Sequence, residues 1–82
     1  MLYIVESWVM VFPEIEDLVE RAREVGNEVV ECGECKTVEQ AIEQIQHLMG
    51  HHDEVHIISS NGAYFAAAVV MGVNFTWALD LY

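Results

Sequence analysis

The chain has 82 residues, and fourteen acidic residues against three basic ones give it a formal net charge of −11 at pH 7. Apolar residues make up 54% of the sequence, which excludes a disordered chain and indicates one small globular domain over residues 1–82. The acidic excess argues against direct binding to nucleic acid, because neutralising phosphates requires lysine and arginine.

The first segment, residues 2–12, reads LYIVESWVMVF and is almost continuously apolar. Such a run predicts a central strand that is covered on both faces. Glu6 interrupts it, and the sequence leaves open whether this acid is buried or faces outward at an edge. Pro13 is well placed as the first residue of a helix, and Gly26 ends that helix.

The middle of the chain predicts a strand, a helix and a strand. A short strand is expected over residues 28–32. Thr37 and Gln40 form a capping box, so the second helix begins at Thr37, and Gly50 ends it. The β-branched run over residues 55–58 then predicts a buried strand.

Residues 63–71 have two interpretations. Asn61-Gly62 is a hairpin signal, and a hairpin there would make this segment a strand. The segment is rich in alanine, Ser60 or Asn61 can serve as its N-cap, and Gly72 fits a C-terminal cap. We therefore favour a helix.

This alternation predicts an α/β fold, a small two- or three-layer β-α-β-α-β-(α)-β domain with a mostly parallel sheet. The alternating residues 74–82 form its edge C-terminal strand. The hairpin interpretation would instead give an α+β fold with a C-terminal antiparallel meander. The longest apolar run, residues 63–73, is too short to span a bilayer, and the apolar N-terminus lacks the basic segment of a secretory signal. We expect a cytoplasmic protein, in the host cell cytoplasm if it is viral.

Cys32 and Cys35, together with His47 and His51, have a spacing close to that of a zinc finger. A helix that begins at Thr37 would place His47 about 15 Å from the cap, too far from the cysteines for one zinc ion. We therefore predict no metal and no cofactor.

The same two cysteines could form a redox dithiol, because a helix N-terminus lowers the pKa of a nearby thiol. Glu31 and Glu34 flank the pair and oppose the thiolate. We prefer two reduced thiols in a turn.

The turn Ser59-Ser60-Asn61-Gly62 has the best position for a small-molecule site, since open α/β sheets bind ligands beyond the carboxyl ends of their strands. The cysteine turn would lie at the same edge. Ordinary capping accounts for these residues more simply. The candidate ligand or redox residues are Ser59, Ser60, Asn61, Gly62, Cys32 and Cys35.

The leading functional hypothesis is a small acidic non-enzymatic protein that inhibits or regulates a basic, nucleic-acid-binding protein partner by imitating the charge of nucleic acid. No catalytic arrangement can be located by spacing. The chain is similar in size and charge alone to phage anti-restriction and anti-CRISPR proteins. The alternative is a small ligand-binding or thiol-redox module. The predicted partner-binding residues are Glu24, Glu28, Glu31, Glu34, Glu39, Glu43, Asp53 and Glu54.

The last third of the chain predicts self-association. Residues 63–71 would be apolar all round as a helix, which is unusual in so small a domain. An open edge at the C-terminal strand could pair with a second copy. We expect a homodimer whose interface includes Tyr64, Phe65, Phe75, Trp77 and Tyr82.

Overall fold

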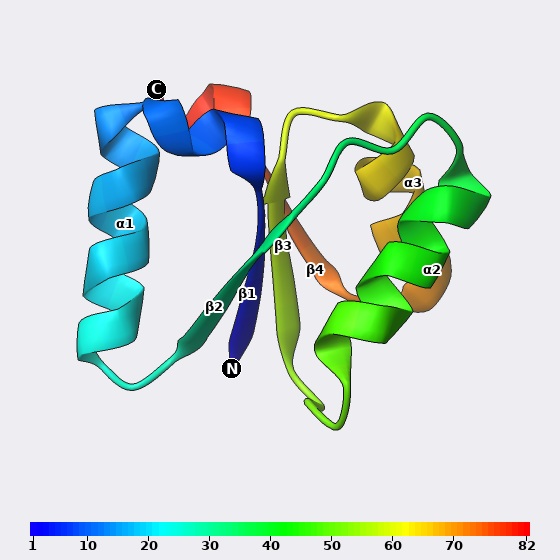
Figure 1. Cartoon of the computed structure of the whole chain (residues 1–82), viewed down its shortest axis with the longest axis horizontal. Coiled ribbons are helices and arrows are strands. Elements are labelled where there is room, and N and C mark those ends of the chain that lie inside the picture. The colour runs from blue at the N-terminus through cyan, green and yellow to red at the C-terminus, as the bar shows by residue number, and fades with distance from the viewer.

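The computed structural model describes residues 1–82 and contains a four-stranded, all-parallel sheet with helices on both faces (Figure 1). The strands are β1 (Leu2–Glu6), β2 (Glu28–Cys32), β3 (Val55–Ser59) and β4 (Asn74–Trp77), in the spatial order β2-β1-β3-β4. The helices are α1 (Pro13–Glu24), α2 (Val38–Met49) and α3 (Gly62–Met71), and the 3-10 helices are η1 (Ser7–Val11) and η2 (Ala78–Asp80). The predicted α/β domain with an edge C-terminal strand is confirmed, and the antiparallel meander is excluded.

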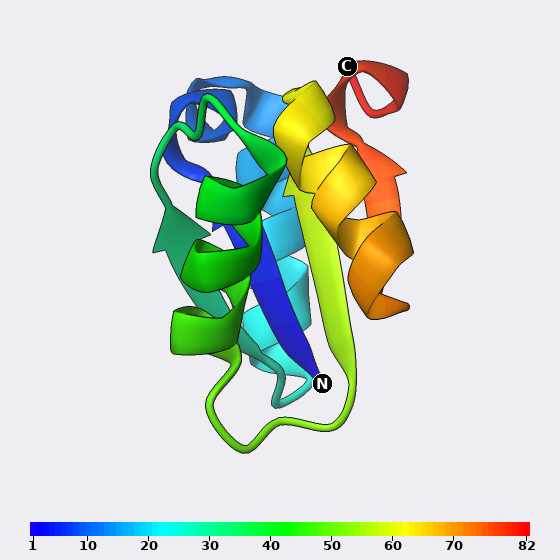
Figure 2. The same ribbon diagram turned by 90° about the vertical axis from the view of Figure 1, so that its right-hand side faces the viewer.

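The molecule has three layers. Helix α1 covers one face of the sheet, while α2 and α3 pack side by side on the other (Figures 1 and 2). Figure 2 shows α2 on the side of the sheet where β2 lies and α3 on the side where β4 lies. No helix combines the length and the apolar character that crossing a bilayer requires.

The alternation of side chains along each strand divides the core between the two faces. Leu2 and Ile4 of β1 contribute to the cluster under α2 and α3, whereas Val5 points to the α1 side. The first cluster also includes Val55, Ile57, Ala41, Ile45, Tyr64, Ala67 and Ala68, and the second includes Val9, Ile15, Val19, Ile58 and Ala78. Both faces of β1 and β3 are therefore covered, as the apolar strand sequences predict.

Helix caps explain where α2 and α3 begin and end. The Thr37 hydroxyl accepts the Gln40 backbone N–H at 3.1 Å, as the capping box predicts. Asn61 caps α3 by accepting the Ala63 N–H at 2.8 Å. Gly72 ends α3 in the left-handed conformation, with φ of 71°. The helical interpretation of residues 63–71 is confirmed.

Two predicted strands are too long. The run over residues 2–12 contains β1 only as far as Glu6, and η1 follows, with Val9 buried on the α1 side. A buried helical turn and a buried strand give the same apolar run, so the sequence does not separate them. Similarly, the strand predicted over residues 74–82 ends at Trp77, and the chain turns into η2, which buries Ala78.

Candidate functional site

The carboxyl ends of β1, β2 and β3 meet at one edge of the sheet, where the strand order reverses. The chain runs from β1 outward to β2, then crosses back past β1 to β3. Parallel α/β sheets bind ligands beside such a reversal, because the loops on either side of it diverge. The last residues of these three strands are Glu6, Cys32 and Ser59.

Glu6 is the most unusual residue at this edge. It is only 1% exposed, although it carries a carboxyl group. Its Oε1 atom accepts the Ser59 hydroxyl at 2.6 Å and the Ser60 backbone N–H at 3.3 Å. The hydroxyl oxygen of Ser60 is itself buried without a hydrogen-bond partner. The site therefore centres on a buried acid whose location the sequence left open.

The serine turn and the cysteine turn are joined at this edge, as their places after strands predict. The Asn61 side-chain amide donates to the Cys35 carbonyl at 2.8 Å. The Tyr64 hydroxyl donates to the Gly33 carbonyl at 2.6 Å, and the Cys35 thiol donates to the Tyr64 hydroxyl at 3.2 Å. These contacts fix the turn after β2 against the start of α3. Gly62, the first residue of α3, is exposed and lies beside them.

Both cysteines are free thiols and both are buried. Burial is the main cause that raises the pKa of Cys32 to about 11, and the nearby Glu6 carboxylate adds to the shift. With that pKa, roughly one Cys32 thiol in ten thousand is ionised at pH 7. Because the thiolate is the reactive form, this environment disfavours a redox or nucleophilic role for Cys32.

Alkylation of Cys32 by iodoacetamide at pH 7 is expected to be at least about a hundredfold slower in the native protein than in the urea-unfolded chain. The reason is the rise of the pKa from 9.0 to about 11, which removes most of the thiolate below pH 9. Peptide mapping by mass spectrometry measures the rate for each cysteine separately. Equal rates in the two states would favour the thiol-redox interpretation.

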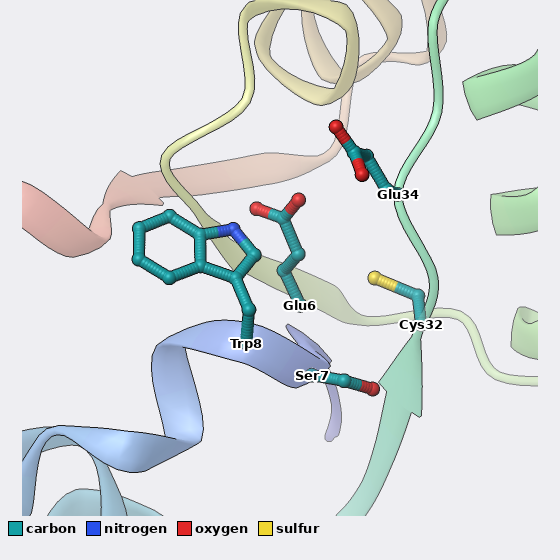
Figure 3. Close-up of a pocket in the computed structure, with 5 residues that line it drawn as sticks. All are labelled: Glu6, Ser7, Trp8, Cys32 and Glu34. Carbon is teal, nitrogen blue, oxygen red and sulfur yellow. The ribbon is translucent and has the colours of Figure 1, made fainter.

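A pocket of about 370 Å³ opens beside Glu6. It is lined by Glu6, Ser7, Trp8, Cys32 and Glu34. Figure 3 shows the carboxyl groups of Glu6 and Glu34 pointing into the same space, with the Trp8 indole beside Glu6. Trp8 was not predicted as a site residue. Trp8 lines the same pocket as Glu6 because the chain turns into η1 after Glu6, and the interpretation of residues 2–12 as one long strand concealed that turn.

All eight acids of the predicted partner surface are exposed. Glu28 and Glu31 lie on β2, an edge strand of the sheet, and Glu34 lies in the turn that follows. Glu39 and Glu43 are on α2, which lies on the same side of the molecule (Figure 2). The remaining three are Glu24, Asp53 and Glu54, at the end of α1 and in the loop before β3. We call these eight residues the acidic edge.

The residues of the predicted dimer interface separate into three environments. Phe65, Phe75 and Trp77 form one cluster, with ring centroids 4.9–5.4 Å apart, between α3 and the unpaired edge of β4. Tyr64 is instead fully buried in its own chain. Tyr82 stacks on Phe12, away from this cluster, with centroids 3.6 Å apart.

The four histidines do not gather with the cysteines. His47 and His51 are exposed, whereas Cys32 and Cys35 are buried. His52 contacts Glu28 at 2.7 Å, and His56 contacts the Thr76 hydroxyl at 2.6 Å. No three histidine, cysteine or acidic side chains come close enough together to hold a metal ion.

Comparisons of the chain with protein-family models, with curated proteins and with solved structures find no match.

Proposed function

We propose that this protein is a small non-enzymatic binding protein whose acidic edge engages a basic, nucleic-acid-binding protein partner. The observation that supports this most is the separation of charge within the fold. Five of the eight acids of the acidic edge lie on β2, on the turn after it and on α2, at one side of the molecule. Residues 55–79, which form β3, α3 and β4, contain no aspartate, glutamate, lysine or arginine.

Most of the acids have no partner within the chain. Only two ion pairs form, between Arg21 and Asp17 and between His52 and Glu28. Lys36 is the single lysine or arginine between Glu24 and Glu54. An uncompensated surface of this kind attracts a basic partner over a long range and accelerates association.

The spacing of the two acids on α2 suits a groove that is built for phosphates. Glu39 and Glu43 are one turn apart on α2, or about 6 Å along the helix axis. Glu28 and Glu31 are about 10 Å apart along β2, and the alternation of side chains places them on opposite faces of this edge strand. A basic groove that binds nucleic acid contacts phosphate groups that are also closely spaced, so its lysines and arginines would pair with the carboxylates on α2 as they pair with phosphates. The proposed activity is inhibition or regulation by occupying such a groove in the cytoplasm, where free thiols stay reduced.

Replacing Glu39 and Glu43 with lysine is expected to slow association with a basic protein at least about tenfold at low salt, because four units of charge change on the acidic edge. The probe is a histone, and the readout is the association rate by surface plasmon resonance at several salt concentrations. The native rate should fall steeply between 20 and 150 mM salt, values chosen because screening grows over that range.

The matched control replaces Glu16 and Glu20 with lysine. These residues are also exposed, also one helical turn apart, and lie on α1, outside the acidic edge. The net charge changes equally in both variants, so a slower rate in both would reflect net charge alone. Equal effects, or binding that does not depend on salt, would contradict the proposed surface.

The other side of the molecule supports a second part of the proposal, a homodimer. Phe65, Val69 and Val70 of α3 and Phe75 and Trp77 of β4 form an uncharged surface that we call the apolar edge. Val69 is 66% exposed and Val70 is 70% exposed. The net charge of −11 opposes self-association, so a second copy is expected to dock where charge is absent.

A further inference from the structure

The carboxyl group of Glu6 has one oxygen that the chain leaves without a hydrogen bond. Both hydrogen bonds of this carboxyl group, from Ser59 and Ser60, go to Oε1. The Oε2 atom accepts none, and the carboxyl group points into the pocket (Figure 3). Because Oε1 is occupied by Ser59 and Ser60, Oε2 is the oxygen of this carboxyl group that a ligand in the pocket would contact.

The chain supplies no cation for this position. Neither of its two ion pairs involves Glu6 or Glu34. Both carboxyl groups nevertheless line the same pocket, and Figure 3 shows them pointing into the same space from β1 and from the turn after β2. A positively charged ligand in this space would be able to contact both carboxyl groups.

Trp8 indicates which kind of cation fits. Its indole lines the same pocket and is 47% exposed, although tryptophan is usually more deeply covered in a folded domain. The face of an indole attracts guanidinium and alkylammonium groups, which are weakly hydrated compared with a metal ion. The Cys32 thiol also lines the pocket, and sulfur is a poor ligand for Ca²⁺ and Mg²⁺, which prefer oxygen.

We propose that this pocket binds a guanidinium or alkylammonium group, which pairs with Glu6 and Glu34 and lies against the Trp8 indole. The group could belong to a small free molecule or to an arginine or lysine side chain of a protein. The inference shares Glu34 with the acidic edge, but it rests on the buried carboxyl group of Glu6 and the Trp8 indole, which do not belong to that edge.

The test is a titration of ¹⁵N-labelled protein with N-acetyl-arginine methylamide and, separately, with the lysine analogue. Binding should shift the NMR signal of the Trp8 indole N–H. Glu6→Gln should weaken binding at least about tenfold, because a charge-assisted hydrogen bond is lost. Glutamine keeps an oxygen for the Ser59 hydroxyl, so the fold should be retained.

Three controls make the result specific. The neutral citrulline analogue has nearly the same shape as arginine and should not bind. Glu31→Gln removes an exposed acid outside the pocket and should leave binding unchanged. Trp8→Leu should also weaken binding, and it provides an independent variant if Glu6→Gln proves unstable.

Binding of citrulline equal to that of arginine, or equal affinity in the native protein and in both Glu6→Gln and Trp8→Leu, would overturn the proposal. So would the absence of any shift at millimolar probe. If an arginine-containing peptide binds more tightly than the single amino-acid analogue and loses affinity in Glu6→Gln, the source is a protein side chain. If the analogue alone binds, the source is a small molecule. Glu6→Gln and Trp8→Leu leave all eight residues of the acidic edge unchanged, and the histone experiment tests that edge separately.

Discussion

Replacing Tyr64 with alanine is expected to lower the free energy of unfolding by about 3–5 kcal/mol, the usual cost of removing a buried aromatic side chain. Tyr64 has no exposed surface and is the largest fully buried side chain in the protein. It extends from α3 into the core cluster and also holds the turn after β2 through Gly33 and Cys35. Domains of this size have only several kcal/mol of net stability, so the variant should be largely unfolded at 37 °C.

Urea unfolding measured by circular dichroism tests this expectation. Tyr64→Phe serves as the conservative variant, because it keeps the ring and loses only the hydroxyl contacts, at a cost of about 1–3 kcal/mol. Phe65→Ala is the matched control, since the neighbouring ring on α3 is partly exposed and should matter less. A native-like midpoint for Tyr64→Ala would show that the core does not depend on this residue.

Replacing Val69 and Val70 with glutamate is expected to convert a homodimer into a monomer. Both side chains are mostly exposed on α3, so the monomer should keep its fold. In the dimer, however, the new charges would be buried without partners, which is strongly unfavourable. Light scattering at high micromolar concentration should give twice the chain mass of 9.3 kDa for the native protein and 9.3 kDa for the variant.

The matched control replaces Val11 and Val25 with glutamate. These valines are equally exposed but lie outside the apolar edge, so this variant should remain dimeric although it gains the same charge. Salt offers a second distinction. It should strengthen the homodimer, by screening the repulsion between two acidic chains, and weaken binding of a basic partner. A native protein that is monomeric at high micromolar concentration would refute the dimer.

The sequence predicted the helices well because each of them has local signals. Thr37 caps α2, Asn61 caps α3, and Gly72 ends α3 as expected from residue type alone. The ends of β1 and β4 were not predictable in this way. Pairing in the sheet decides where a strand ends, and β1 ends at Glu6, opposite the last paired residue of β2, Cys32.

The candidate site was predicted only in part. The carboxyl ends of β2 and β3 could be identified, because turn residues follow both strands in the sequence. Glu6 carries no such signal, since an acid within an apolar run can be buried or can face outward. Its burial results from contact with Ser59 and Ser60, more than fifty positions away in the chain. Trp8 joins the pocket only through the turn into η1.

The position of β1 at the centre of the sheet affects how the protein folds. Leu2 pairs with Glu28 on one side and with Val55 on the other. The second pairing closes a long loop of chain. The chain loses the entropy of closing this loop before the new contacts contribute any stability. Folding should therefore be slow for a domain of this length, in the range of milliseconds or longer. Until β3 is in place, β1 exposes an unpaired apolar edge, so the newly made chain is most prone to aggregate during this interval.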